Sequence, residues 1–241
     1  MKHRGAGRLV PGIAQVLKWT MHPSSMERMS AFRDRYLEKR RDERLAILDV
    51  GSGDVNGTYR ELFTMPTWRY TGLDMAPGKN VDLVPRDPYF WHELAAESFD
   101  VVISGQAFEH VEFFWETIRE IARVLKPQAL CCIIAPSAAP EHRHPVDCWR
   151  FYPDGFSALA RYAGLEVLEV NTDWNAPDRW FADTVLVCRK PREDPGMRFR
   201  RTAWRWLSHL LKPRLHDTLS PSRCSEGPAA GATATSRNAP S

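Results

Sequence analysis

The sequence has no long apolar run and few features of an exported protein. None of its hydrophobic stretches approaches the roughly 20 residues that a membrane-spanning helix needs. The N-terminal stretch MKHRGAGRLVPGIAQVLKW is basic and only weakly apolar, and it lacks the apolar core and cleavage site of a signal peptide. The five cysteines are odd in number and include no CxxC pair, which indicates free thiols in a reducing compartment. We therefore expect a cytoplasmic protein.

Two common nucleotide-binding motifs are also absent. There is no G-K-[ST] tripeptide, which excludes a P-loop as a motif. Residues 51–56 read G-S-G-D-V-N, so the third glycine of GxGxxG is missing there and comes one place late, at Gly57. This spacing disfavours a nicotinamide dehydrogenase.

The charge is distributed unevenly along the chain. Residues 1–44 carry 11 Lys and Arg against 5 Asp and Glu, and residues 190–241 carry 10 against 4. The stretch between them is acidic, although the formal net charge of the whole chain is +3. The basic ends favour an anionic partner, or they are simply solvated arms.

The middle of the chain alternates short β-rich runs with helical patterns, which is typical of a parallel α/β sheet with helices on both faces. Strand candidates lie at 45–50, 69–74, 81–84, 99–104, 129–135, 165–170 and 184–188. Apolar spacing predicts helices over 112–125 and about 153–163, the second ending at Gly164. No long helical pattern separates the last two strands, so we expect a hairpin that puts one antiparallel strand into the sheet.

Composition divides the chain into four parts. Residues 1–44 are predicted to form a basic helical extension, and residues 45–189 the main domain. Residues 190–216 hold a linker and a basic amphipathic helix at 197–212, which suits either an anionic membrane surface or docking on the protein itself. Residues 217–241 are rich in Ser, Pro, Ala, Thr and Gly, which predicts disorder.

The stretch ILDVGSGDVNG runs a predicted strand into an acid and three glycines. Asp49 ends the strand, and Gly51 and Gly53 make a bend in which the backbone can approach a ligand. Asp74 ends the second strand, where a carboxylate can accept hydrogen bonds from both hydroxyls of a ribose. Dinucleotide and nucleoside cofactors share these features, and each is also compatible with a purely structural turn.

Three further stretches follow in order: FDVVISGQAFEHV, EIARVLKP and CCIIAPS. With the two motifs before them, they make residues 45–188 resemble the class I S-adenosylmethionine-dependent methyltransferases of type 11. The family shows an acid-x-Gly-x-Gly motif, an acid after strand two, an FDVV-type strand followed by EH, and a helix ending in RVLKPGG. This chain departs from it at KPQA, where Gln128 and Ala129 stand in place of two glycines.

The resemblance implies a Rossmann-like seven-stranded sheet in the order 3-2-1-4-5-7-6, with strand seven antiparallel, and S-adenosylmethionine as the cofactor. The residues implied to contact the cofactor are Asp49, Gly51, Gly53, Asp74, Met75, Asp87, Ser104, Gly105 and Gln106. Among these, Asp74 would hold the ribose, and Met75 and Asp87 would lie at the adenine. Ser104 and Gln106 would lie beneath the cofactor, towards the transferable methyl group.

His110 follows the fourth expected strand, beside the region of methyl transfer. It is therefore our candidate for a base that assists a hydroxyl acceptor, an effect worth about 10²–10⁴-fold in rate. The alternative is that Glu109 and His110 organise their loop and that proximity alone drives the reaction.

The stretch PEHRHPVDCWRFYPDG, residues 140–155, gathers aromatic and charged side chains after the fifth strand. An aromatic ring there can stack on a sugar face, and Arg or His can reach hydroxyls or an acidic group. The predicted acceptor-binding residues are His144, Asp147, Trp149 and Arg150. The H-x-H-x-x-D pattern that starts at His142 also suits a metal, but it is common by chance, so we expect no metal site. A loop that only ties itself down is the remaining alternative.

These patterns together predict an O-methyltransferase acting on a small-molecule or carbohydrate-like acceptor, such as a glycoconjugate, and no nucleic-acid partner. Several stretches, among them VDLVPRDPYFW, resemble a bacterial subset of type 11 enzymes that often occurs with enzymes of cell-surface polysaccharides. One alternative is a lipid-linked or quinone-like acceptor at the inner membrane face, which the helix at 197–212 suggests. Another is a cofactor-binding regulatory protein without catalysis. The oligomeric state is left open.

Overall fold

The computed structural model describes residues 23–192, except for 56, 173 and 175–181. The helix predicted at 197–212 and the disorder predicted at 217–241 lie outside the described residues. The described residues belong to one unit, which ends at Arg192. No helix among them has the length and apolar character to span a membrane.

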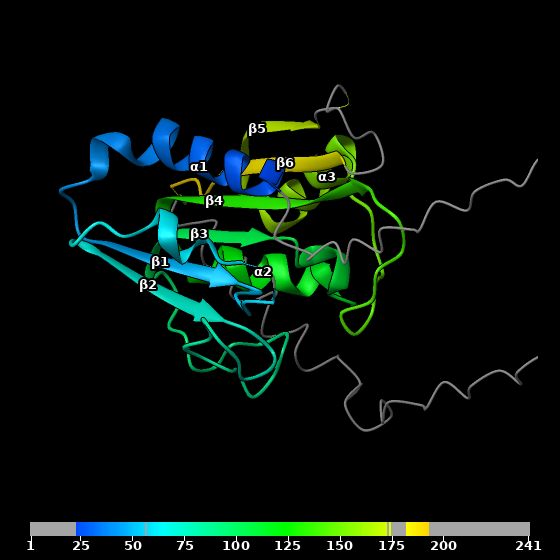
Figure 1. The fold of residues 1–241 in the computed structure, drawn as a ribbon. Coiled ribbons are helices and arrows are strands. Elements are labelled where there is room, and N and C mark those ends of the chain that lie inside the picture. Colours follow the sequence, from blue (N-terminus) through cyan, green and yellow to red (C-terminus); the bar gives the residue numbers. More distant parts are fainter. Residues whose placement is uncertain (1–22, 56, 173, 175–181, 193–241) are drawn as a thin grey trace, which may run out of the picture. The chain divides into compact units, whose positions relative to one another are not determined.

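Six strands form one mixed sheet (Figure 1). They are β1 (Leu45–Val50), β2 (Trp68–Leu73), β3 (Phe99–Gly105), β4 (Leu125–Ala138), β5 (Glu166–Thr172) and β6 (Ala182–Arg189). Their order is β2-β1-β3-β4-β6-β5, and β6 is antiparallel to both of its neighbours while β1 to β4 are parallel. The Rossmann-like order and the antiparallel strand of the final hairpin are confirmed.

The strand predicted at 81–84 is reduced to a single parallel bridge between Leu83 and Leu73. The N–H groups of Asp82 and Leu83 both donate to the carbonyl of Gly72, at 2.8 and 2.9 Å. A regular parallel strand would give successive groups different partners. Pro85 follows at once and has no N–H to continue the ladder. Among the residues that the structure describes, the sheet therefore has six strands instead of seven, and one bridge marks the position of the seventh.

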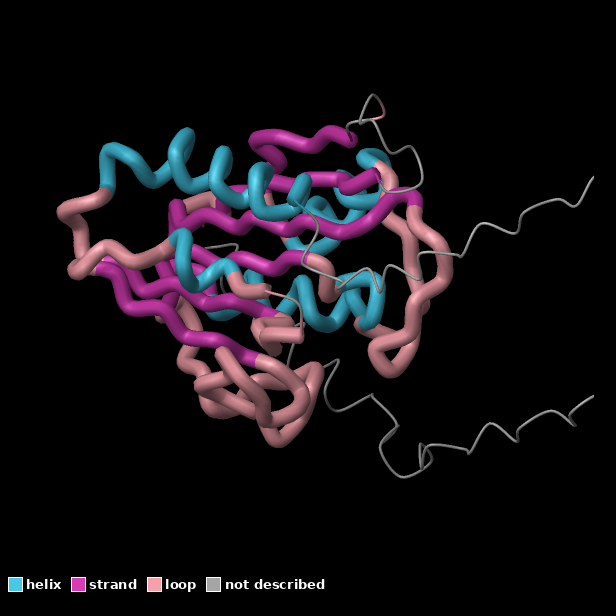
Figure 2. The backbone as a smooth tube through the Cα atoms, in the orientation of Figure 1, coloured by secondary structure: helices cyan, strands magenta, loops and turns pink. Residues whose placement is uncertain are grey.

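Helices cover both faces of the sheet (Figures 1 and 2). On one face lie α2 (Phe114–Val124) and α3 (Pro153–Ala163), and on the other lies α1 (Pro23–Leu37). Successive side chains of β3 alternate between the two: Val102 joins the core under α2 and α3, and Val101 the core under α1. A strand buried on both faces explains the continuous apolar run FDVVIS.

The ends of α3 agree with the sequence prediction. Pro153 occupies the first turn, where its missing N–H has no cost, and Gly164 ends the helix in the left-handed region at a φ of 71°. Helix α2 begins two residues later than predicted, at Phe114.

Helix α1 comes from the segment predicted as an N-terminal extension, and it packs on the sheet. Met29 and Phe32 are buried in the core on that face. The Ser24 hydroxyl donates to Oδ2 of Asp183 at 2.8 Å, and Arg35 pairs with Glu169 of β5 at 2.8 Å. The sheet is therefore covered on this face by residues that precede the family motifs.

The departure from the family pattern at Gln128 has a visible consequence. Gln128 has a φ of 66°, in the left-handed region that favours glycine. Its N–H donates to the carbonyl of Lys190 at 2.7 Å, which joins the start of β4 to the end of β6. The chain thus keeps the turn that a glycine would make, with a residue that strains it.

Candidate functional site

The turns after β1, β2 and β3 meet at the carboxyl end of the parallel strands (Figure 2). Gly51, directly after β1, has a φ of 79°, and a Cβ there would lie 2.3 Å from Cβ of Ala107. Glycine is therefore required at position 51 for both conformation and space. The N–H groups of Gly51 and Ser52 donate to the carbonyl of Leu73, at 2.9 and 3.1 Å, and tie the bend to β2.

Asp74 follows β2 and points its carboxylate at the same bend. Oδ2 accepts from the N–H of Gly53 at 2.9 Å, and Oδ1 accepts from the N–H of Ala76 at 3.3 Å. Met75, the next residue, is 51% exposed. A fixed carboxylate and an exposed apolar side chain therefore lie next to each other at this bend.

Asp49 lies deeper, at the end of β1, and is 2% exposed. The Tyr70 hydroxyl donates to Oδ2, whereas Oδ1 has no hydrogen-bond partner among the described residues. Burial raises the pKa of Asp49 to about 7, against its ordinary value of 3.8. A buried carboxylate oxygen without a partner is costly and is suited to a cationic or hydrogen-bonding ligand.

The end of β3 forms the next wall. The Ser104 hydroxyl donates to the carbonyl of Val50 at 2.7 Å and locks the ends of β3 and β1 together. A Cβ at Gly105 would lie 2.0 Å from the hydroxyl oxygen of Tyr59, so glycine admits this ring. Tyr59 begins the short helix η2 (Tyr59–Leu62).

Gln106 links the site to α1. Its Nε2 donates to Oδ1 of Asp183 at 3.0 Å and to the hydroxyl of Ser25 at 3.3 Å. Its φ of 55° is again in the left-handed region, which marks a backbone held by its surroundings. Helix α1 therefore positions a predicted cofactor residue.

These turns enclose a cavity of about 680 Å³. The predicted cofactor residues that line it are Asp49, Gly51, Gly53, Asp74, Met75, Ser104, Gly105 and Gln106. Asp87 is not in the lining: its Oδ1 accepts from the N–H of Tyr89 at 2.8 Å, and Pro88 and Tyr89 line the cavity in its place. Asp87 shapes the turn that carries its neighbours.

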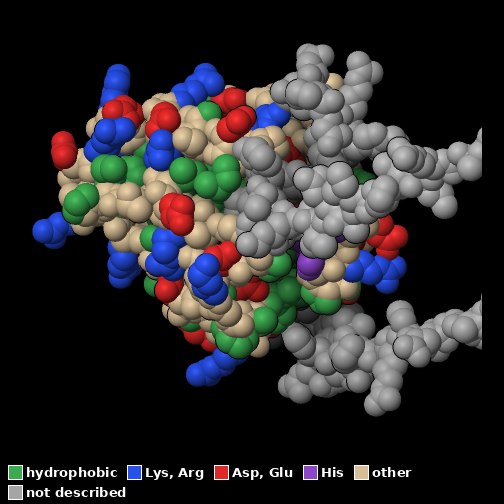
Figure 3. Space-filling model, in the orientation of Figure 1, with side chains coloured by type: hydrophobic (Ala, Val, Ile, Leu, Met, Phe, Trp, Pro, Cys, Tyr) green, Lys and Arg blue, Asp and Glu red, His purple; other side chains and the backbone are tan. Residues whose placement is uncertain are grey.

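The surface around this end of the sheet mixes apolar and ionisable side chains. On the face in Figure 3, histidine surface lies beside hydrophobic surface, and Lys and Arg are interspersed with Asp and Glu. The cavity mouth is completed by Glu141, His142 and His144, from the loop after β4.

Comparison with known proteins agrees with this geometry. A family model described as "Methyltransferase domain" matches residues 48–133, which include the end of β1, all of β2, β3 and α2, and most of β4. No curated protein has a matching sequence. Residues 48–133 therefore carry a methyltransferase domain, and the protein is a class I S-adenosylmethionine-dependent methyltransferase.

Solved structures show the same fold at low sequence identity. A 1,6-didemethyltoxoflavin-N1-methyltransferase from Burkholderia thailandensis, solved with its acceptor and S-adenosylhomocysteine, is 17% identical with a TM-score of 0.53; the match covers 70% of this chain and 79% of that one. A protein from Galdieria sulphuraria described as a sarcosine dimethylglycine methyltransferase is 17% identical with a TM-score of 0.52, over 68% and 86%. A protein from Bacillus halodurans described as a methyltransferase is 14% identical with a TM-score of 0.50. The match covers 70% of this chain and 98% of that one.

The residues of the methyltransferase suit its cofactor, S-adenosylmethionine. Ribose hydroxyls need acceptors, and Asp74 offers a carboxylate already oriented by Gly53. The unpartnered Oδ1 of Asp49 can accept from the ammonium group of the methionine part. The glycine at position 51 lets backbone approach where a side chain would collide.

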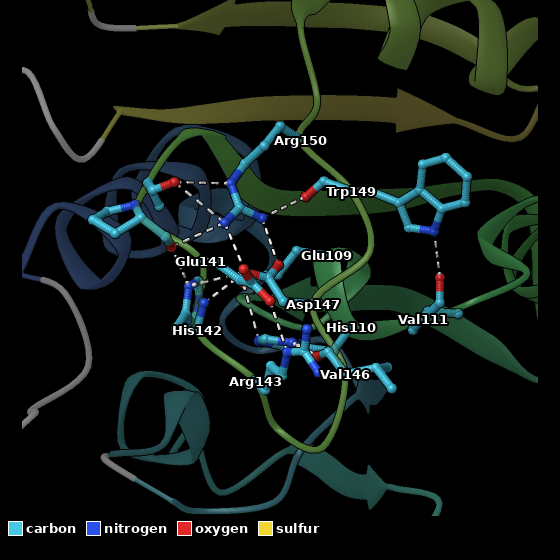
Figure 4. Close-up of polar contacts among 12 residues, drawn as sticks. Glu109, His110, Val111, Glu141, His142, Arg143, Val146, Asp147, Trp149 and Arg150 are labelled. Carbon is cyan, nitrogen blue, oxygen red and sulfur yellow. Dashed lines mark hydrogen bonds and ion pairs between the residues drawn. The ribbon is translucent and has the colours of Figure 1, made fainter. Parts of the chain in front are cut away.

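Three of the four predicted acceptor residues make contacts that hold their own loop in place (Figure 4). Arg150 donates to both carboxylate oxygens of Asp147, at 2.5 and 2.8 Å, and to the carbonyls of Ala139 and Pro140. This pairing holds the pKa of Asp147 well below its usual range. Neither side chain lines the cavity.

Trp149 is also directed away from the cavity lining. Its indole N–H donates to the carbonyl of Val111 at 3.0 Å, and its ring packs edge-on against Phe114 of α2. Of the predicted acceptor residues, only His144 lines the cavity. The loop conformation expected as the simpler alternative is the one observed for Asp147, Trp149 and Arg150.

Glu109 and His110 lie in the short helix η3 (Phe108–His110) after β3 and line the cavity. Nδ1 of His110 lies 2.6 Å from the carbonyl of Val146, which can only accept, so Nδ1 carries the proton and Nε2 keeps a lone pair. Burial lowers the pKa of His110, which keeps the ring neutral near pH 7. Burial raises the pKa of Glu109 to about 8.

The sequence does not reveal Tyr70 and Ser25, which bond Asp49 and Gln106, or Tyr59, which bonds Ser25 and lies against Gly105. Each lies far along the chain from the residue it supports, and none belongs to a recognisable motif. The sequence around His110 indicates only a loop-organising role for Glu109, whereas in the structure Glu109 lines the cavity.

Proposed function

We propose that the methyltransferase transfers a methyl group to a hydroxyl oxygen of a small-molecule or carbohydrate-containing acceptor. The observation that carries the proposal is His110, a neutral imidazole on the cavity wall, held through Nδ1 with its Nε2 lone pair free. Nε2 can accept the proton of a hydroxyl as the new C–O bond forms. An acceptor without such a proton would not need this group.

When bound, S-adenosylmethionine supplies an electrophilic methyl carbon on a positively charged sulfur. The chain must hold acceptor and donor in line and keep water out. Positioning of that kind can supply about 7–11 kcal/mol, whereas a general base contributes about 10²–10⁴-fold, or roughly 3–5 kcal/mol. Loss of His110 should therefore slow the enzyme without abolishing transfer.

The cavity mouth supports a polar acceptor. Glu141, His142 and His144 line it on one side, and Asp54 and Lys79, an ion pair at 2.5 Å, on another. Such a rim offers hydrogen bonds to a molecule with several hydroxyl groups. The Burkholderia enzyme, an N1-methyltransferase solved with a small molecule bound, supports a small-molecule acceptor and does not bear on the choice of a hydroxyl oxygen.

The test is a screen of activated sugars, glycolipids and small phenols with the full-length protein, with mass detection of both S-adenosylhomocysteine and methylated product. We expect one hydroxyl-bearing class to gain a methyl group. His110→Ala should lower kcat by about 10²–10⁴-fold and leave cofactor affinity unchanged. His92→Ala, at an exposed histidine outside the cavity lining, is the matched control.

Two results would contradict the proposal. Methylation confined to amines or carbon atoms would refute the O-acceptor. Cofactor binding without turnover on any acceptor class would favour a regulatory protein that binds S-adenosylmethionine without catalysis.

We also propose that the basic segment 197–212 contacts anionic membranes from the cytoplasmic side, which would suit a lipid-linked acceptor. Its support is the sequence pattern alone. Co-sedimentation of the full-length protein with phosphatidylserine vesicles at low salt tests it. The chain truncated after Arg192 should stay in the supernatant, and equal sedimentation of both would refute the contact.

A further inference from the structure

Glu109 is a buried acid whose side chain has no hydrogen-bond partner among the described residues. It is 0% exposed and lines the cavity. Arg150, which lies nearby, directs its donors to Asp147 and to backbone carbonyls instead (Figure 4). Buried carboxylates in proteins are ordinarily paired, hydrogen-bonded or bound to a metal.

His110 places a free nitrogen next to this acid. Its Nε2 lies 3.7 Å from Oε1 of Glu109. Its Nδ1 is held by the carbonyl of Val146 at 2.6 Å, so the ring is oriented and Nε2 has the lone pair. A histidine that donates one N–H to a backbone carbonyl and offers the other nitrogen is the usual arrangement of a metal ligand.

His142 repeats the arrangement from the loop after β4. Its Nδ1 lies 3.0 Å from the carbonyl of Pro140, which again leaves the lone pair on Nε2. Its ring centroid is 5.1 Å from that of His110, and its side chain is 32% exposed. Its backbone N–H donates to Oδ2 of Asp147 at 2.7 Å, which fixes the loop at this residue.

We propose that Glu109, His110 and His142 bind a divalent transition-metal ion at the wall of the cofactor cavity. One ligand atom from each residue lies within 4.8 Å of the other two. Ligands of tetrahedral zinc lie about 2.0–2.2 Å from the metal, hence about 3.3–3.6 Å apart, so the main adjustment is an inward movement of His142. His142 lies on a loop and is part-exposed, so it can make that movement more readily than Glu109.

The ligand chemistry narrows the choice of metal. Two imidazole nitrogens and one carboxylate suit Zn²⁺, Co²⁺, Fe²⁺ or Mn²⁺ better than Mg²⁺ or Ca²⁺, which prefer oxygen ligands. Three protein ligands also leave coordination positions open, as in catalytic metal sites.

The site differs from the metal pattern read from the sequence. H-x-H-x-x-D would have used Asp147, but both oxygens of Asp147 are taken by Arg150. Glu109 replaces it, from a segment 33 positions before His142. Asp147 then supports the site by holding the backbone of His142.

The consequence for catalysis rests on the proposed O-methyl transfer. An open metal position facing the cavity can bind the acceptor hydroxyl, and a divalent cation lowers the pKa of the hydroxyl it contacts. The proton leaves to solvent, the oxygen forms the new C–O bond, and the C–S bond breaks with its electron pair on sulfur. His110 then acts as a ligand, because one lone pair cannot hold a metal and accept a proton at the same time.

Metal binding is tested apart from catalysis, with Co²⁺ as the probe. Full-length protein freed of metal by chelator and dialysis is titrated with Co²⁺, followed by its visible absorption and by calorimetry. We expect one ion per chain. Glu109→Gln and His142→Ala should each weaken Co²⁺ binding by at least about tenfold. Mutations of residues that only support metal ligands already lower metal affinity by about that factor.

Glu112→Gln and His92→Ala are matched controls at exposed positions and should bind Co²⁺ as the unaltered protein does. His142→Ala removes a part-exposed loop side chain, so it remains informative if Glu109→Gln fails to fold. Cofactor affinity, measured in each variant, confirms that the cavity is intact.

Absence of stoichiometric Co²⁺ binding, or equal binding by all variants, would overturn the metal site. Binding that needs Glu109 and His142, in a protein that methylates no hydroxyl acceptor, would leave the site standing and refute the O-methyl transfer. O-methyl transfer at full rate in excess chelator would refute the role of the metal in catalysis and leave the O-methyl transfer standing. His110 would then act as a base, with no metal in the reaction.

Discussion

The backbone N–H of Gly53 donates to Oδ2 of Asp74 at 2.9 Å, so one carboxylate joins the bend after β1 to the end of β2. A Cβ at position 53 would lie 3.0 Å from that oxygen, which is tighter than ordinary contact. Glycine at this position thus permits the bond. The carboxylate is therefore oriented before a ligand arrives, which lowers the entropic cost of binding.

Asp74→Ala should weaken binding of S-adenosylmethionine by about 2–4 kcal/mol, because two charge-assisted hydrogen bonds to the ribose are lost. Asp74→Asn keeps an acceptor for Gly53 and should lose less. Calorimetric titration measures both. Unchanged affinity in a folded Asp74→Ala protein would show that the ribose is held elsewhere.

Gly51→Ala should destabilise the fold by about 2–5 kcal/mol. The left-handed φ of 79° costs a non-glycine residue about 1–2 kcal/mol, and overpacking against Ala107 adds about 1–3 kcal/mol. Urea denaturation checks this value. Gly155→Ala is the matched control: nothing lies within 4 Å of its Cβ position in α3, so stability should rise by up to about 1 kcal/mol. Equal effects of the two substitutions would contradict the steric account.

Gln128→Gly should stabilise the protein by roughly 1 kcal/mol, since it relieves the left-handed strain at a φ of 66° and keeps the N–H bond to Lys190. Part of the gain is offset by the greater freedom of glycine in the unfolded chain. Gln128→Ala keeps the strain and should bring no gain. Thermal unfolding of the three proteins side by side decides the matter.

Asp49→Asn should change how stability depends on pH. Burial raises the folded-state pKa of Asp49 to about 7, above its ordinary 3.8, so the folded protein holds this proton more tightly than the unfolded chain. The stability that Asp49 gains from this tighter proton binding is fully present below about pH 4 and is lost as the pH rises through about 7. The free energy of unfolding changes by about 4 kcal/mol in total over this range. The amide of the variant does not titrate in this range.

The melting temperature of Asp49→Asn, relative to the unaltered protein, should therefore increase steadily from pH 4 to pH 8 in the absence of cofactor. A constant difference across that range would mean that Asp49 is ionised throughout. The amide of the variant can still accept from the Tyr70 hydroxyl, so the comparison isolates the charge.

Local sequence patterns determined the strands, α3 and the cofactor turn of this methyltransferase. β1 and α3 have the predicted bounds because apolar periodicity, Pro153 and Gly164 act within a few residues of one another. Asp49, Gly51 and Asp74 could be placed at one edge because the carboxyl ends of parallel strands must meet there. The prediction of a strand at 81–84 was wrong, because its position at the sheet edge and Pro85 prevented a regular ladder of hydrogen bonds.

Contacts between distant segments decided the rest. The seat of α1 depends on Ser24 and Ser25 meeting Asp183 and Gln106, about 80 to 160 positions away, and no local pattern encodes such pairs. Arg150 was free to face an acceptor as far as the sequence could tell, and the fold directed it to Asp147 because a buried carboxylate needs a partner. The buried carboxylate of Glu109 has no such partner among the described residues. The sequence does not show that His142 lies beside it, because only the fold of the loop after β4 brings the two residues together.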